Sequence, residues 1–226
     1  MTGTADPDTV PSPHPGPIGL MAGTAARRVM QSLMRTGQEA RFIGGCVRDA
    51  LLGIQAADVD IATPLPPDEV MRRLRQDGIR VIPTGIEHGT VTALTEGASF
   101  EITTLRRDVE TDGRHAVVAF TDSWLEDASR RDFTFNAMSL TPEGELYDPF
   151  GGVRDLKTGR VRFIGQARER IAEDVLRILR FFRFHARFGQ GRPDPDALAA
   201  CATMAPLMPS LSGEREIGRA SCRERV

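Results

Sequence analysis

The chain of 226 residues carries 29 Lys and Arg against 31 Asp and Glu, which gives a formal net charge of −2. This balance excludes a protein that attracts nucleic acid through a global positive field, so any RNA contact requires a local basic surface. Three cysteines without paired spacing argue against a disulfide framework or a zinc site. No apolar run approaches the roughly 18 residues that would predict a membrane span. We therefore expect a cytoplasmic protein with one globular domain and part of another.

The N-terminal third begins with a segment that is not expected to fold. Residues 1–22 are rich in proline and contain too little apolar surface to order themselves, which predicts a disordered leader. Apolar residues at helical spacing then predict a helix over residues 23–37. Residues 39–43 follow as the first buried strand.

A glycine turn and two alternating aspartates come next. At Gly44 and Gly45 the backbone can approach a ligand without a Cβ in the way. Residues 47–52 predict the first turns of a helix whose free N–H groups suit an anion such as a triphosphate. Asp58 and Asp60 share one face of a strand, with Cα atoms roughly 7 Å apart, so their carboxylates can bind hard divalent cations. This pairing indicates phosphoryl or nucleotidyl transfer by metal ions.

Each half of this pattern has an ordinary alternative. A lone Gly-Gly pair is usually only a turn, and a lone Asp-x-Asp is usually a solvated strand end. An EF-hand is disfavoured because no third ligand and glycine follow Asp60. The combination over residues 42–63 is much more specific. Its string Gly-Gly-Cys-Val-Arg-Asp, followed by Asp-Val-Asp-Ile-Ala-Thr, resembles the class II tRNA nucleotidyltransferase (CCA-adding enzyme) and bacterial poly(A) polymerase family, within the nucleotidyltransferase superfamily of DNA polymerase beta.

This resemblance implies a fold and an activity. The implied fold is α+β, a polymerase-beta-like nucleotidyltransferase head with a mixed sheet and helices, followed by an incomplete all-helical neck. The implied activity is template-independent addition of C and A from CTP and ATP to the 3′ end of tRNA, with Mg²⁺ as cofactor. Asp58 and Asp60 would then hold the catalytic metal ions, and Gly45 and Arg48 would bind the triphosphate region.

The following elements extend the expected sheet. They are predicted as a helix over residues 66–78 and strands over residues 79–82, 90–94 and 100–105. Glu101 is either a third carboxylate that a neighbouring strand delivers beside the aspartates, or an exposed residue of an edge strand. The polar residues 108–115 predict a mobile surface loop, and the resemblance implies that this loop takes part in switching between CTP and ATP.

Residues 130–138, Arg-Arg-Asp-Phe-Thr-Phe-Asn-Ala-Met, combine apolar anchors with packed charges. From the local pattern alone, Arg131 pairs with Asp132, caps a helix or serves a ligand. The segment resembles the family's second motif, which implies that Arg131 contacts the triphosphate or nucleotide. The elements expected after it are a connector over residues 147–152, a hairpin turn over residues 157–160 and a strand over residues 161–164.

A single long helix is predicted over residues 167–188. Its apolar stripe comprises Ile171, Val175, Ile178 and Phe182, and its charged side comprises Asp174, Arg177, Arg180 and Arg183. Enclosed arginines require anionic or acceptor partners, which leaves an internal salt-bridge seam and a ligand-lined cleft as equal interpretations. The helix resembles the family's Glu-Asp-x-x-Arg motif, whose Asp and Arg read the incoming base.

The resemblance makes Asp174 and Arg177 the base-reading pair, and the chemistry of the bases agrees with it. Cytosine and adenine both present an amino donor beside a ring-nitrogen acceptor, which an aspartate and an arginine match. Uracil and guanine present the opposite order and would leave both side chains unsatisfied. Arg180 and Arg183 are expected to help hold the base, the phosphates or the helix.

The resemblance covers residues 42–215, and residues 216–226 look like translated sequencing-adapter DNA, so we expect a truncated reading frame. The expected organisation is a leader (1–22), a head (23–165), the start of a neck (166–215) and a non-native tail (216–226). The expected partners are the tRNA 3′ end, CTP and ATP, and the oligomeric state stays open. The alternatives are a poly(A) polymerase of the same family and a fragment that binds nucleotide without catalysis.

Overall fold

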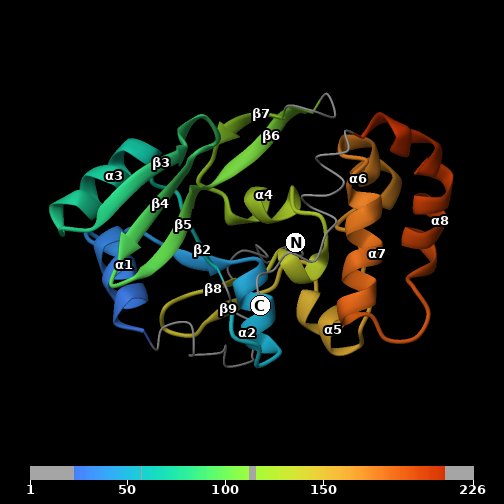
Figure 1. Cartoon of the computed structure of the whole chain (residues 1–226), viewed down its shortest axis with the longest axis horizontal. Coiled ribbons are helices and arrows are strands. Elements are labelled where there is room, and N and C mark those ends of the chain that lie inside the picture. Colours follow the sequence, from blue (N-terminus) through green and yellow to red (C-terminus); the bar gives the residue numbers. More distant parts are fainter. Residues whose placement is uncertain (1–22, 57, 112–115, 212–226) are drawn as a thin grey trace, which may run out of the picture.

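The computed structural model describes residues 23–56, 58–111 and 116–211, and the predicted leader and tail lie outside these residues. Its centre is a seven-stranded sheet in the order β3-β4-β5-β2-β1-β8-β9 (Figure 1). These strands are β1 (Arg41–Ile43), β2 (Val59–Thr63), β3 (Arg80–Gly85), β4 (Thr90–Thr95), β5 (Ala98–Thr104), β8 (Ser139–Leu140) and β9 (Leu146–Tyr147). Strand β2 pairs parallel with β5 and antiparallel with β1, so the sheet is mixed. The predicted α+β fold is confirmed.

Helices α1 (Thr24–Met34) and α3 (Pro67–Gln76) lie together beside β3 and β4 (Figure 1). Both contribute side chains without solvent exposure to the main core, where Leu33 and Leu74 join Ile102 of β5. Burial of such apolar side chains stabilises the fold by about 1.5–3 kcal/mol each relative to an exposed position. The sequence therefore placed both helices correctly from their apolar spacing.

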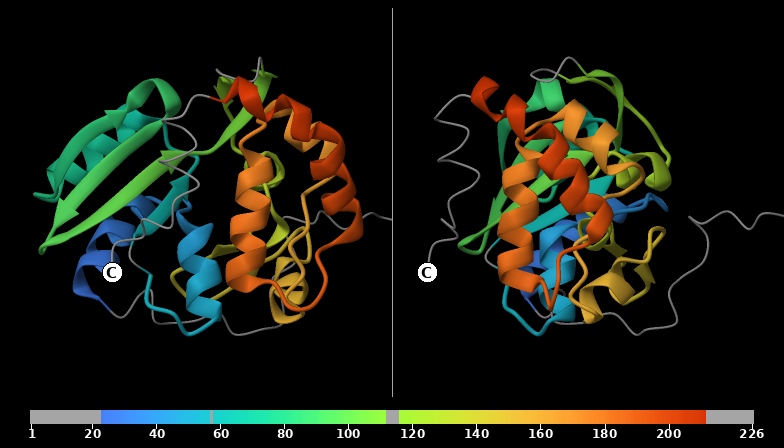
Figure 2. Two further views of the ribbon diagram at one scale, coloured as in Figure 1. Left: turned by 45° about the vertical axis from the view of Figure 1, so that its right-hand side comes forward. Right: turned by 90° about the vertical axis from the view of Figure 1, so that its right-hand side faces the viewer.

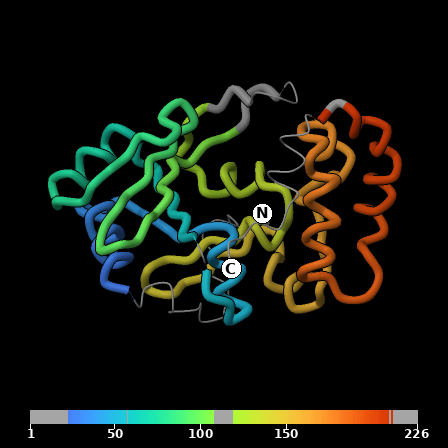
Figure 3. Tube along the Cα trace, viewed as in Figure 1, coloured from blue at the N-terminus to red at the C-terminus, as the bar shows by residue number. Residues whose placement is uncertain are grey.

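Strand β2 is the element on which the site depends. Its partner β1 leads through a glycine turn into α2 (Gly45–Leu51), and this segment runs through the middle of the molecule (Figure 3). On the other side, Asp60 of β2 lies directly opposite Glu101 of β5. Because β5 lies between β2 and β4, it is an interior strand. The edge-strand part of the alternative for Glu101 is therefore wrong, whereas its expected exposure is confirmed.

A second, two-stranded sheet pairs β6 (Arg106–Thr111) with β7 (Ala116–Phe120). The predicted surface loop over residues 108–115 is thus wrong for its first part, and residues 112–115 lie outside the described residues. The polar sequence of this segment lacks the apolar alternation that predicts a strand, because the strands of a two-stranded sheet need not bury either face. The 3-10 turn η2 (Ile86–His88) connects β3 to β4 and lies beside the base of this ribbon, where Arg106 Nη1 donates to the His88 carbonyl at 2.5 Å.

Helix α5 (Gly152–Lys157) lies between the predicted connector and the predicted turn, where the sequence predicted no element, so the turn over residues 158–159 ends a helix and not a hairpin. The Asp148 carboxylate accepts the N–H groups of Gly152 and Val153 at 2.6 and 2.9 Å, so an aspartate four residues upstream satisfies free donors at the helix start. A side chain at position 152 would lie 2.4 Å from the Thr134 carbonyl, which explains the glycine. The predicted strand over residues 161–164 is only an isolated bridge between Phe163 and Phe133.

The helical part consists of α6 (Ala167–Glu173), α7 (Arg177–Phe188), α8 (Pro195–Met204) and the 3-10 helix η4 (Ala205–Ser210). The single helix predicted over residues 167–188 is wrong, because Asp174 is extended, with φ −152° and ψ 106°. Its carboxylate accepts the Leu176 N–H at 3.2 Å, an aspartate turn that competes with helix continuation. The predicted stripe is broken accordingly, and Phe182 is 46% exposed.

Aromatic packing joins the helical part to the sheet part. Phe133 lies 4.7 Å from Phe163, 5.3 Å from Phe184 and 6.5 Å from Phe181, measured between ring centroids. All four rings are buried, so the interface between the two parts is a continuous core. Helices α6 to α8 consequently form one group beside the sheet (Figure 2). In the part of the chain that the structure describes, no helix is long and apolar enough to cross a membrane.

Candidate active site

A polar cleft of about 390 Å³ lies where the glycine turn, the start of β2 and helix α7 meet. It is lined by Gly44, Gly45, Asp60, Arg130, Arg131, Asp132, Asn136, Asp174, Arg177 and Arg180. Six of the predicted site residues are therefore brought together from segments that are distant in the sequence. Asp58, Arg48 and Arg183 are predicted site residues that do not line it.

The glycine turn is shaped to receive an arginine. Gly44 has φ +70° and ψ −127°, a conformation that side-chain-bearing residues rarely adopt. A Cβ at this position would lie 3.0 Å from Arg131 Nη1, so the absence of a side chain makes room for the guanidinium. The Gly44 N–H donates to the Met138 carbonyl at 3.1 Å, which fixes the turn against the segment that carries Arg131.

Three carboxylates lie near one another at the start of β2. Burial, followed by the negative charges of Glu101 and Asp58, raises the pKa of Asp60 to about 6, although Arg131 opposes this rise. Asp58 is exposed, and Glu101 lies directly opposite Asp60 in the parallel register. Mutual repulsion of this kind favours a bound cation or a proton. Within residues 23–56, 58–111 and 116–211, no three His, Cys, Asp or Glu side chains lie close enough together to hold a metal ion.

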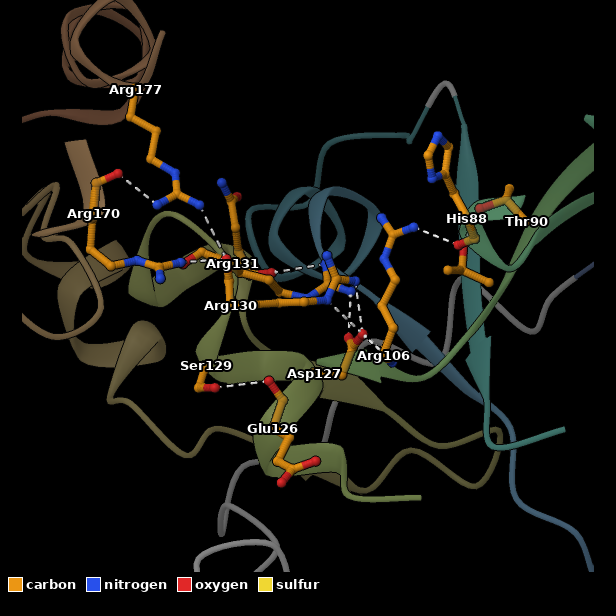
Figure 4. A network of polar contacts seen from close by, with 12 residues as sticks. His88, Thr90, Arg106, Glu126, Asp127, Ser129, Arg130, Arg131, Arg170 and Arg177 are labelled. Atoms are coloured by element: carbon orange, nitrogen blue, oxygen red, sulfur yellow. Dashed lines mark hydrogen bonds and ion pairs between the residues drawn. The ribbon is translucent and has the colours of Figure 1, made fainter. Parts of the chain in front are cut away.

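Arg131 and its neighbour Arg130 are both held by one buried carboxylate. Asp127 Oδ2 accepts from Arg131 Nη2 at 3.0 Å, and Asp127 Oδ1 accepts from Arg130 Nη2 at 2.7 Å (Figure 4). Burial by itself would raise the pKa of Asp127, but Arg131 and Arg130 outweigh it and hold the pKa below its usual range. The sequence analysis missed Asp127. Its spacing of three and four residues from the arginines on a short helix, α4 (Trp124–Ser129), was an available signal.

Asp132 pairs with α7 rather than with its neighbour Arg131. Its Oδ2 accepts from Arg180 Nε at 2.6 Å, and its Oδ1 accepts from Asn136 Nδ2 at 3.0 Å. The local alternative of an Arg131–Asp132 pair is therefore wrong. Arg180 thus lies at the cleft with its guanidinium already bound to a buried acid.

Asp174 and Arg177 both line the cleft, but the ion-pair partner of Arg177 is Glu173. Arg177 Nη1 lies 2.5 Å from Glu173 Oε2 and 2.7 Å from the Arg170 carbonyl. Arg177 Nη2 also donates to the Arg130 carbonyl at 3.3 Å (Figure 4). Arg177 therefore reaches from the helical part to the residues around Arg131.

Arg48 and Arg183 lie elsewhere. Arg48 is 4% exposed, and its donors engage Asp49 Oδ1 and Asn136 Oδ1, each at 2.8 Å. Its guanidinium lies 4.6 Å from the Phe188 ring, beneath the cleft-lining residues. Arg183 packs over the Phe184 ring at 4.8 Å. Neither residue lines the cleft, although Arg48 contacts it through Asn136.

Comparison with known proteins identifies relatives of this chain. Residues 40–162 match the family model described as the poly(A) polymerase head domain. The chain is 46% identical over 192 residues to the mitochondrial CCA tRNA nucleotidyltransferase 1 of Homo sapiens, covering 84% of this chain and 44% of that protein. The chain thus spans about half the length of the curated relatives it matches.

Two solved structures share the fold. The crystal structure of the Bacillus stearothermophilus CCA-adding enzyme in complex with CTP has a TM-score of 0.74 and 38% identity, covering 83% of this chain and 44% of that chain. A tRNA nucleotidyltransferase complexed with a primer tRNA and an incoming ATP analog has a TM-score of 0.70 and 31% identity, covering 84% and 54%.

Proposed function

The chain belongs to the poly(A) polymerase head domain family, and from this premise we propose that it adds C and A from CTP and ATP to the 3′ end of tRNA. The observation that carries the proposal is the cleft, which gathers Gly45, Asp60, Arg131, Asp174 and Arg177 at one place. The relatives named above support the substrates, because one is solved with CTP and another with a primer tRNA and an ATP analog.

The residues around Asp60 fit a magnesium site. The family consists of metal-dependent nucleotidyltransferases, and hard carboxylate oxygens are the ligands that Mg²⁺ prefers. The repulsion that raises the pKa of Asp60 is what a divalent cation would relieve. Mg²⁺ is commonly held by one or two carboxylates together with substrate phosphates, which suits the pair Asp58 and Asp60.

We assign Asp58 and Asp60 as the ligands that would hold the metal, with Glu101 beside them. When bound, the metal supplies charge neutralisation for the triphosphate and lowers the pKa of the attacking hydroxyl. Glu101 would add negative charge at this position and strengthen the attraction for a cation. Asp58 is solvent-exposed, so it is accessible to a cation that arrives with the nucleotide.

The triphosphate would lie against the glycine turn and Arg131. Gly44 and Gly45 leave the backbone without side chains at the cleft wall, and Arg131 presents a guanidinium there. Arg48 was expected to bind the nucleotide as well, but its donors are directed at Asp49 and Asn136. We propose that Arg48 supports Asn136, which lines the cleft, rather than touching the phosphates.

Asp174 and Arg177 would choose the base. An aspartate accepting from the amino group and an arginine donating to the ring nitrogen match cytosine and adenine and mismatch uracil and guanine. Uracil and guanine would be rejected because the polar atoms of both side chains would lose their hydrogen-bond partners in the complex. Arg180, held by Asp132, would bind the sugar or the phosphates. Arg183 would help to stabilise α7 itself.

The test is extension of a tRNA that lacks its CCA end, with CTP and ATP supplied separately and together. Ordered incorporation of C and then A by the 226-residue chain, abolished in Asp60→Asn, is the expected result. Incorporation of A alone in long tracts would identify a poly(A) polymerase instead. Binding of CTP and ATP without extension would identify a nucleotide-binding protein that does not catalyse. A cytoplasmic location stays a prediction, since the human relative is named as mitochondrial.

A further inference from the structure

Arg170 of α6 is a charged residue that joins the helical part to the segment Arg130–Arg131. Its side chain is 12% exposed. Its Nη2 donates to the Arg131 carbonyl at 2.8 Å and also to the Arg130 carbonyl (Figure 4). Its Nη1 lies 2.7 Å from Glu173 Oε2. One planar guanidinium therefore binds two successive carbonyls and a carboxylate at once, a fork geometry that lysine cannot reproduce.

The two carbonyls belong to the end of α4, whose C-cap is Arg130. The last carbonyls of a helix have no partner within the helix, so they accept donors from elsewhere. Arg177 Nη2 donates to the same Arg130 carbonyl at 3.3 Å. Arg170 and Arg177 of the helical part therefore both donate to backbone carbonyls of the segment Arg130–Arg131.

Arg170 also interacts with Arg177, through its backbone carbonyl and through a shared carboxylate. The Arg170 carbonyl accepts from Arg177 Nη1 at 2.7 Å, and both guanidiniums contact Glu173. Without the Arg170 side chain, Glu173 would attract Arg177 alone, and the Arg131 carbonyl would lose the charged donor that the structure gives it. The Arg170 side chain is therefore linked to Arg177 through two shared partners, the Glu173 carboxylate and the Arg130 carbonyl.

We propose that Arg170 is a positioning residue that sets base selectivity by holding Arg177 and the Arg130–Arg131 backbone in one arrangement. This inference rests on the proposed function, in which Arg177 reads the base. Arg170 does not line the cleft, so it acts through these neighbours and not by touching the nucleotide.

The experiment is calorimetric titration of the 226-residue chain with CTP, ATP, UTP and GTP in the presence of Mg²⁺. The variants are Arg170→Ala and Arg170→Lys, and the matched control is Arg168→Ala, an exposed arginine on the same helix. Lysine keeps the charge but not the fork, so both Arg170 variants should lower the ratio of UTP to CTP dissociation constants about tenfold, the loss of roughly one charged hydrogen bond. Arg168→Ala should leave the ratio unchanged.

Three outcomes are decisive. A lowered ratio in Arg170→Lys with the melting temperature of the wild type supports the inference, because a purely structural role would not change selectivity. An unchanged ratio in both Arg170 variants overturns it, whatever happens to overall affinity. A wild-type chain that does not distinguish CTP from UTP overturns the proposed function, and this inference with it.

Discussion

The Asp132 carboxylate accepts from Arg180 Nε at 2.6 Å, an ion pair between residues 48 positions apart. Asp132 also accepts from Asn136, which in turn accepts from Arg48 Nη1 at 2.8 Å. A chain of polar contacts therefore runs from α7 along the wall of the cleft to the helix that follows the glycine turn. Substrate groups that enter the cleft would therefore contact side chains that already hold one another in place by hydrogen bonds.

This ion pair gives the stability a predictable pH dependence. Burial by itself would raise the pKa of Asp132, but Arg180 and Asn136 outweigh it and lower the pKa below its usual value. Asp132 therefore contributes stability above its unfolded pKa of about 3.9, and this contribution is lost as the pH falls through the folded pKa. Asp132→Asn should lower the free energy of unfolding at pH 7 by about 2 kcal/mol, since it leaves Arg180 without its acid.

Urea unfolding between pH 3 and pH 7 measures this effect. The difference between wild type and Asp132→Asn should shrink toward the acid end of the range. Glu143→Gln, at an exposed loop position, is the control and should match the wild type throughout. A constant difference at every pH would contradict the assignment of the lowered pKa to Asp132.

Gly44 and Gly53 provide a matched pair for the glycine turn. Both have φ +70°, but a Cβ at Gly44 would lie 3.0 Å from Arg131 Nη1, whereas a Cβ at Gly53 would meet nothing within 4 Å. Alanine at either position should cost about 1 kcal/mol of stability from backbone strain. Only Gly44→Ala should also weaken CTP and ATP binding, by about tenfold, because it displaces Arg131 from the cleft. Equal nucleotide affinity in the two variants would show that Arg131 does not contact the nucleotide.

The local motifs of the site were predictable from the sequence, but the contacts that organise them were not. Gly44, Gly45 and Asp60 lie within one short segment, so spacing and alternation identified them directly. Asp127 was harder to identify, because its spacing from Arg130 and Arg131 has meaning only on a helix, and a helix of six residues carries little apolar periodicity. The Arg180–Asp132 pair depends on how α7 packs against the sheet part, which no local pattern encodes.

The break in the predicted long helix has a similar origin. Apolar residues continue across Asp174, so periodicity alone favours one helix. The aspartate ends it by accepting the Leu176 N–H, and the turn redirects α7 so that Phe181 and Phe184 are buried instead of Phe182. Competition between a side chain and the backbone for the same donor is decided by tertiary packing.

Asp60 should show opposite effects on activity and stability. Burial and the charges of Glu101 and Asp58 raise its pKa to about 6, so its charged form is unfavourable in the metal-free protein at neutral pH. Asp60→Asn should lower the rate of nucleotide addition by roughly a thousandfold, corresponding to the several kcal/mol of charge stabilisation that a metal ion supplies. The metal-free protein should unfold at the same temperature or a higher one.

Asp58→Asn separates the two effects. Asp58 is exposed, so its removal should reduce activity while leaving the melting temperature of the metal-free protein within experimental error of the wild type. Addition of EDTA should abolish activity in the wild type, and Mg²⁺ should restore it. Full activity of both variants would exclude these carboxylates as metal ligands.

Arg177 and Arg183 lie six residues apart on α7, and of these two only Arg177 lines the cleft. Arg183 packs over the Phe184 ring at 4.8 Å. Arg177→Ala should therefore remove most of the discrimination between CTP and UTP, by about tenfold or more, because the ring nitrogen loses its charged donor. Arg183→Ala should retain the discrimination and lower only the stability. Misincorporation of UMP and GMP into a tRNA primer measures both variants. If Arg183→Ala misincorporates as readily as Arg177→Ala, the cleft-lining face of α7 is not the face that reads the base.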